Sequence, residues 1–141
     1  MNENREHCKR IALELEACAN GDLYKCPNCG EVLRFSDLQP DPPNGLYCCL
    51  NCLASFDEGE LETFDLFDFF HDAFDIEYRV GSDKEYRSVR IMVAFGGPNI
   101  YIDTRSKAVE LNWWTEHESF PLSLDAVEAV DEWASEAWGW V

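Results

Sequence analysis

The feature that most constrains this 141-residue chain is a pair of Cys-x-x-Cys motifs with nineteen residues between them. The first motif reads CPNCG at residues 26–30, and the second reads CLNC at residues 49–52. In each motif one tight turn aims two sulfur atoms at the same point, so two turns can complete a tetrahedron around one ion. The spacing therefore predicts a structural zinc site with four thiolates.

Residues 23–56 resemble the zinc-ribbon family, in which two such knuckles on hairpins grip one ion. Pro27 presets the first turn, and Gly30 allows the positive φ that frees backbone amides to point at sulfur. The second knuckle departs from the family pattern because Leu53, not Gly, follows its last cysteine. The resemblance implies that one structural Zn²⁺ is bound by Cys26, Cys29, Cys49 and Cys52.

The sequence leaves open alternative ligands and alternative roles for these cysteines. Cys48 could replace Cys49 as a ligand, although its pair with Cys52 would then have three intervening residues. Redox chemistry is a weaker alternative, because no βαβ pattern surrounds either motif. A catalytic ion is weaker still, because four thiolates leave no open position for water.

The composition is that of a folded, soluble chain. Hydrophobic residues make up 46% of the sequence, including nine Phe and five Trp, which is ample for a core. No apolar run is long enough to span a bilayer, and the N-terminus is too polar for a signal peptide, so we expect a cytoplasmic protein. In that compartment Cys8 and Cys18 are expected to be buried thiols, not disulfides.

Acidic residues dominate the charge and are unevenly distributed. The formal net charge is −17, from 28 acidic and 11 basic side chains. Residues 35–78 and residues 108–141 contain no Lys or Arg, and their net charges are −11 and −8. Direct nucleic-acid binding is disfavoured, because affinity for phosphates comes largely from Lys and Arg. An acidic surface is either simply solvated or built to meet a basic partner.

The segment from Glu60 to Ile76 is predicted to be an amphipathic helix. Four phenylalanines would share one face: Phe64, Phe67, Phe70 and Phe74. On such a helix, successive carboxylates rise about 4.5–6 Å along the axis, which is close to the spacing of phosphates in a nucleic-acid strand. A solvated acidic face is the plain alternative. The proposed partner-binding residues on this stripe are Glu62, Asp65, Asp68, Asp72 and Asp75.

The remaining segments predict an α+β fold. Apolar residues at three- and four-residue spacing predict a helix over Glu3–Ala19, ended by Gly21, and a second helix is expected within 121–140, capped by Ser123. Alternating residues predict a β-meander of three or four antiparallel strands between 75 and 114, and the Pro-rich segment 39–45 is expected to be irregular. One face of the sheet is expected to be polar, and it would either face solvent or bind a partner. Its residues are Arg90, Tyr101, Asp103, Asn112 and Trp114.

The predicted organisation is one compact domain in three parts. The N-terminal helix occupies residues 1–22, the zinc ribbon 23–56, and the acidic helix, β-meander and C-terminal helix 57–141. A small antiparallel sheet would be covered by helices, with the zinc ribbon inserted near the N-terminus.

Three hypotheses for function follow. In size and acidity the chain is similar to the small anti-defence proteins of phage and plasmids, including anti-CRISPR and anti-restriction proteins. That resemblance implies an inhibitor of a basic nucleic-acid-handling enzyme, such as a Cas effector or a restriction enzyme. A zinc-ribbon adaptor between proteins is the first alternative. A metal-dependent enzyme is the second alternative. Its site would use Asp65, Asp68 and Asp72 of the acidic helix, or the sheet face with Tyr101 and Asp103. No known catalytic motif is present, and we do not expect an enzyme.

Overall fold

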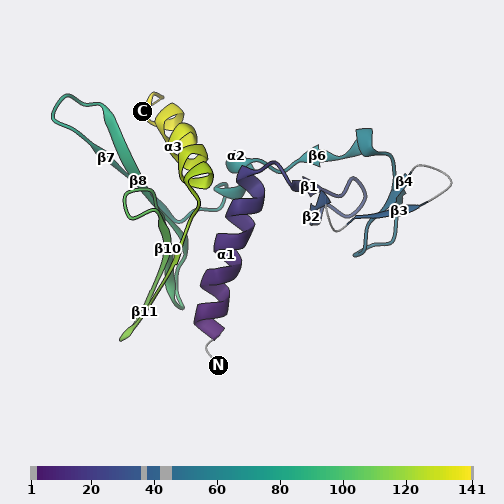
Figure 1. Cartoon of the computed structure of the whole chain (residues 1–141), viewed down its shortest axis with the longest axis horizontal. Helices are drawn as coiled ribbons and strands as arrows, with labels where there is room; N and C mark the ends of the chain where they lie inside the picture. The colour runs from purple at the N-terminus through teal and green to yellow at the C-terminus, as the bar shows by residue number, and fades with distance from the viewer. Residues whose placement is uncertain (1–2, 36–37, 42–45, 141) are drawn as a thin grey trace.

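The computed structural model describes residues 3–35, 38–41 and 46–140, and it has the predicted α+β fold (Figure 1). Helices α1 (Glu3–Ala19) and α3 (Leu124–Trp138) pack on the same side of an antiparallel sheet. A smaller unit, here called the metal module and formed by residues 23–63, projects from the side of α1 that faces away from the sheet. The chain thus has a helix-covered sheet and a projecting module.

The sheet has five strands that follow one another in both sequence and space. They are β7 (Asp75–Val80), β8 (Tyr86–Ala94), β9 (Asn99–Asp103), β10 (Ala108–Trp113) and β11 (Glu116–Pro121). The meander is confirmed, but the prediction of three or four strands missed β11. This edge strand has only one large apolar residue, Phe120, so its sequence lacks the alternation of a half-buried strand.

The apolar face of the sheet forms the main core with the two helices. Ile91, Ile100 and Leu111 are fully buried in this core, and both helices direct small and branched residues at them. Cys8 is also fully buried, and its Sγ donates to the carbonyl of Val109 at 3.6 Å. The core contribution of the helices comes from Cys8, Ala12, Leu15, Ala126, Val127, Val130 and Ala134.

The predicted helices and buried thiols are confirmed. α1 ends where Gly21 takes a φ of 74°, and the side chain of Ser123 accepts a hydrogen bond from the amide of Ala126 at 3.1 Å at the start of α3. Cys18 is buried like Cys8, and its Sγ donates to the carbonyl of Phe64 at 3.4 Å. Burial raises the pKa of Cys8 to about 11 and that of Cys18 to about 12, so both stay protonated at neutral pH.

The metal module consists of two small sheets. The first has the order β2-β1-β6, and the second has the order β3-β4-β5. The prediction that 39–45 lacks regular structure is wrong for residues 39–41, which pair with β4, while residues 42–45 lie outside the described residues. The strands are β1 (Leu23–Lys25), β2 (Val32–Arg34), β3 (Gln39–Asp41), β4 (Leu46–Cys48), β5 (Ser55–Phe56) and β6 (Glu62–Thr63).

The predicted acidic helix from Glu60 to Ile76 is wrong. A short 3₁₀ helix, η2 (Glu58–Glu60), is followed by strand β6 and then by a one-turn helix, α2 (Leu66–Phe69). The chain then turns into β7. The five proposed partner-binding residues consequently do not form one helical stripe.

Pairing with a distant strand explains this difference. β6 pairs with β1, and the amide of Phe64 donates to the carbonyl of Leu23 at 2.9 Å, which holds the backbone extended. A new turn then starts at Asp65, whose side chain accepts from the amide of Asp68 while Asp68 accepts from the amide of Asp65. Like charges along a helix would also repel, so these sheet contacts outweigh the local helical pattern.

A polar network occupies the outer face of the large sheet. Arg79 makes two hydrogen bonds of 2.8 Å to the carboxylate of Asp103, and Arg90 lies 3.6 Å from the ring centroid of Tyr101. Asp103 is only 5% exposed, so it supports the sheet and presents little surface to a partner. Trp114, which was predicted on this face, instead lies in the β10–β11 turn with a φ of 54° and is 88% exposed.

Replacing Asp103 with Asn should lower the free energy of unfolding by about 3 kcal/mol at pH 7, because it leaves the half-buried Arg79 without its charged partner. Burial opposes charge on Asp103, but the Arg79 guanidinium and the amide of Arg105 hold its pKa below the ordinary value. The stabilisation is therefore present above about pH 4 and is lost as the pH falls through the lowered pKa. Urea unfolding at several pH values measures both effects.

Asp83 provides the matched control for this substitution. Its ion pair with Arg87 is exposed, so Asp83→Asn should cost less than about 0.5 kcal/mol at any pH. Equal losses for the two variants would contradict the structural role of Asp103.

Candidate metal centre

Two equivalent turns bring the four cysteines together, one between β1 and β2 and the other before β5. In the first turn the amide of Gly30 donates to the carbonyl of Cys26 at 2.9 Å, and in the second the amide of Leu53 donates to the carbonyl of Cys49 at 2.8 Å. Leu53 has a φ of 64° and Gly30 a φ of 75°. Leu53 therefore adopts the conformation that glycine supplies in the first knuckle, and the departure from the family pattern leaves the geometry unchanged.

The four sulfur atoms form a cluster of the size that a tetrahedral ion requires. All four lie within 4.8 Å of one another, with 3.7 Å between Cys26 and Cys52 and 3.9 Å between Cys29 and Cys49. A tetrahedral ion with metal–sulfur bonds of about 2.3 Å needs sulfur–sulfur distances of about 3.8 Å. The two shorter distances match this value, so the cluster is compatible with one tetrahedral ion.

Side-chain amides link the two knuckles across the cluster. Asn28 Nδ2 donates to Cys52 Sγ at 3.5 Å, and Asn51 Nδ2 donates to Cys29 Sγ at 3.6 Å. Each asparagine thus bonds the second cysteine of the opposite motif. The hydrogen bond from Asn28 stabilises the thiolate and, with a backbone amide, lowers the pKa of Cys52 to about 6.

These two asparagines were missed by the sequence reasoning. Both stand at the third position of their motifs, Cys-Pro-Asn-Cys and Cys-Leu-Asn-Cys. This repetition is the sequence signal from which a shared role could have been predicted. Amide groups of this kind orient ligands and tune a metal site from outside the coordination sphere.

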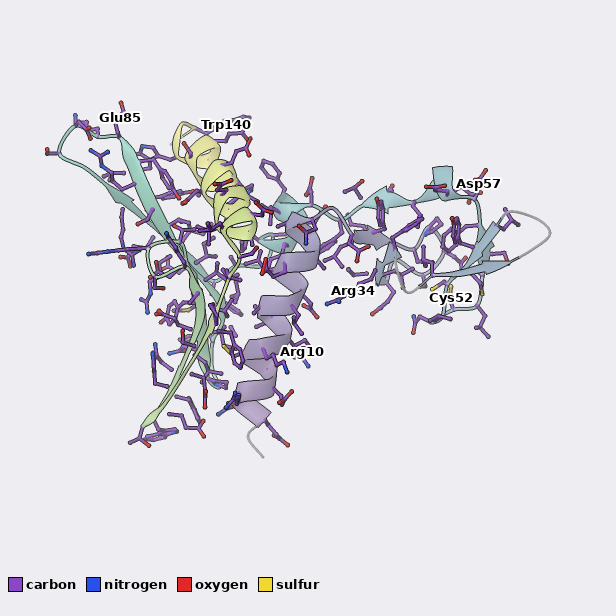
Figure 2. The ribbon with its side chains drawn as sticks, in the orientation of Figure 1. Arg10, Arg34, Cys52, Asp57, Glu85 and Trp140 are labelled. Carbon is purple, nitrogen blue, oxygen red and sulfur yellow. The ribbon has the colours of Figure 1, made fainter. Side chains whose placement is uncertain are left out.

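The cluster has one buried and one solvent-facing side. Cys26 and Cys49 are 3% and 0% exposed, and they form the small core of the module together with Leu38 and Phe56. Cys29 is exposed and Cys52 is half-buried. Figure 2 places Cys52 in the half of the module remote from α1, whereas Arg34 lies on the side facing α1.

The structure resolves the choice between Cys48 and Cys49. Cys49 belongs to the sulfur cluster, as the two-residue spacing predicted. Cys48 lies outside it, and its Sγ donates instead to the carbonyl of Cys49 at 3.6 Å.

The proposed partner-binding carboxylates are dispersed over several local structures. Glu62 lies in β6, Asp65 caps α2, and Asp75 begins β7, while Asp72 lies in the turn between α2 and β7. These four are exposed, whereas Asp68 is half-buried and pairs with Lys25 at 3.1 Å. Hydrogen bonding to the backbone, with help from Lys25, lowers the pKa of Asp68.

A carboxylate metal site is not formed by this segment. Within residues 3–35, 38–41 and 46–140, the group whose His, Cys, Asp or Glu atoms could hold an ion is the cysteine cluster. Asp65 and Asp68, named above as candidate residues of a metal-dependent enzyme, accept hydrogen bonds from each other's backbone amides instead.

Comparison with protein-family models, with curated proteins and with solved structures found no match to this chain. None of the helices in the described residues is both long enough and apolar enough to cross a membrane.

Replacing Cys49 with Ser should abolish stoichiometric metal binding, because it removes a thiolate from the cluster. Cys48→Ser is the matched control and should retain about one ion per chain. Inductively coupled plasma mass spectrometry after gel filtration measures the metal content. If Cys48→Ser lost the ion as completely as Cys49→Ser, the assignment of the ligands would be wrong.

Proposed function

We propose that this protein is a zinc-stabilised, acidic inhibitor that binds the basic surface of a nucleic-acid-handling enzyme. The observation that carries the proposal is the surplus of exposed carboxylates in two stretches of chain that contain no Lys or Arg. A Cas effector or a restriction enzyme is a suitable target class, because such enzymes hold nucleic acid in positively charged channels.

Zinc is the ion that best suits the cysteine cluster. Tetrahedral four-sulfur sites bind zinc or iron, and closed zinc sites of this kind are structural. The cluster leaves no open ligand position for a reacting water. We therefore assign the ion a role in ordering the metal module and no role in chemistry.

The carboxylates between Asp57 and Asp75 support the acidic role because few cations neutralise them. Asp68 pairs with Lys25, but Glu58, Glu62 and Asp72 form no ion pair within the described part of the chain. Helix α3 adds a second group of exposed acids: Asp125, Glu128, Glu132 and Glu136. A surface of this kind attracts basic partners and accelerates their association.

The charge can act without a helical stripe. An irregular backbone displays carboxylates in several directions. They could therefore contact several basic side chains in the channel where the enzyme binds nucleic acid. Each carboxylate that replaces a phosphate would meet an Arg or Lys of the enzyme. The expected signature is strong dependence of binding on salt.

The test is affinity capture followed by competition with duplex DNA. The immobilised protein should retain a basic nucleic-acid-handling enzyme at about 0.05 M salt, and its affinity should fall at least about tenfold by 0.2 M salt. Duplex DNA should compete. A variant with Glu62→Gln, Asp65→Asn, Asp72→Asn and Asp75→Asn should bind weakly, with Asp68 kept because it pairs with Lys25.

A captured protein that is not basic would contradict the proposal. Affinity that is unchanged between the two salt concentrations would contradict it as well.

A second candidate function is that of an adaptor that binds another protein through the second knuckle. Leu50 and Leu53 are 56% and 73% exposed on this turn. Leu50 and Val32 also line a groove of about 820 Å³ between the metal module and α1. Exposed apolar residues beside a groove are typical of protein-binding surfaces.

Leu53→Gly separates the two candidates. Glycine suits the positive φ at this position, so the variant should keep its metal and gain up to about 1 kcal/mol of stability. Partner affinity should change less than twofold if carboxylates carry binding, and at least about tenfold if the knuckle does. Isothermal titration calorimetry with the captured partner measures this difference.

A further inference from the structure

The fold brings the two acidic stretches of the chain together around one open cleft. Helix α2 contacts both α1 and α3 and lies between α3 and the C-terminal end of α1 (Figure 1). A cleft of about 370 Å³ lies at this junction, and we name it the acidic cleft. Its volume is that of a small-ligand or single-side-chain site.

The walls of the acidic cleft come from distant parts of the sequence. One wall is formed by Asp65, Leu66 and Phe67 at the start of α2, and the opposite wall by successive turns of α3. Ala19 and Gly21, at the end of α1, close a third side. The α3 wall consists of Ala129, Glu132, Trp133 and Glu136.

Charge in the cleft is of one sign. Asp65, Glu132 and Glu136 line it, and no Lys or Arg in the described part of the chain does. Asp65 Oδ1 accepts from the amide of Asp68, and neither Glu132 nor Glu136 forms an ion pair with any described residue. Three carboxylates around an apolar surface favour a cation over a neutral or anionic ligand.

Aromatic rings give the cleft a second feature that suits a cation. The Phe67 ring is 62% exposed and stands edge-on to Trp133, with 6.2 Å between the ring centroids. A guanidinium group stacks on aromatic rings and also pairs with carboxylates through its planar fork. An ammonium group matches this combination less well, because it is a compact and strongly hydrated charge.

The half-buried side chain of Trp133 lines the cleft together with Phe67. Its Nε1 atom is enclosed by protein and has no hydrogen-bond partner among the described residues, so it lies out of reach of a ligand in the cleft. The occupant that matches the carboxylates and the aromatic rings is an arginine side chain presented on a polypeptide.

We propose that the acidic cleft binds an arginine side chain of the partner protein. The cleft holds the guanidinium between the carboxylates of α3 and the carboxylate of Asp65, with Phe67 against one edge. This inference rests on the function proposed above and names the contact through which the basic partner is recognised.

The test compares two variants that have the same net charge. The cleft variant carries Asp65→Asn, Glu132→Gln and Glu136→Gln, and Asn preserves the cap of α2. The control variant carries three exposed substitutions outside the cleft: Glu58→Gln, Glu85→Gln and Glu128→Gln. Both variants change the formal net charge from −17 to −14.

The probe is a fluorescent hexa-arginine peptide, with hexa-lysine as the comparison. Fluorescence anisotropy measures the affinity of each protein variant for the two peptides.

The cleft variant should lose at least about tenfold in affinity for hexa-arginine, and the control variant less than about threefold. Wild-type protein should bind hexa-arginine more tightly than hexa-lysine. Phe67→Ala should weaken binding about two- to fivefold. Phe95→Ala, which removes a ring of similar exposure outside the cleft, should have no effect.

The possible failures separate this inference from the proposed function. Equal losses in the two charge variants, with binding still dependent on salt, would overturn the acidic cleft and leave a diffuse acidic surface as the binding site. Absence of salt-dependent binding by the wild-type protein would overturn both.

Discussion

The cluster of four cysteines, which could hold a metal ion, is the constraint on which the metal module depends. Among the described residues, the buried cluster around the cysteines consists of Leu38, Phe56 and two of the cysteines themselves, Cys26 and Cys49. So small a core buries too little apolar surface to offset the entropy of ordering some forty residues. An ion bound by the four cysteines would supply much of the free energy of folding of the module, as in other small metal-dependent units.

The module is joined to the rest of the chain by adjacent strands. β1 leaves α1 and β6 returns beside it, and the Lys25–Asp68 pair connects β1 with α2. The position of α2 is thus set from two sides, by the module through β6 and by the main core through Phe70, which is 4% exposed. The sheet has its own core and needs no support from the metal.

Local signals in the sequence predicted much of this architecture. The cysteine spacing, the apolar period of α1 and the alternation in β7 to β10 all arise within short windows, and the structure confirms each of them. The prediction of an acidic helix was wrong because it relied on the helical spacing of the Phe residues. The backbone of this segment instead pairs with β1, nearly forty residues earlier in the sequence. Asp57 and Asp65 each have an acidic residue three positions later, which is the pattern of a capping box. This pattern indicates that a new helical turn begins at each of them. The acidic cleft could not be predicted, because its walls meet only through tertiary packing.

Strand β6 connects the metal module with the acidic cleft. Thr63 ends this strand and also lines the acidic cleft, so loss of order in the module would disturb one wall of the cleft. Thermodynamic linkage then requires reciprocity. A ligand that needs this wall raises the affinity for the ion by the same factor by which the ion raises the affinity for the ligand. The protein would then hold its metal most tightly when its partner is bound.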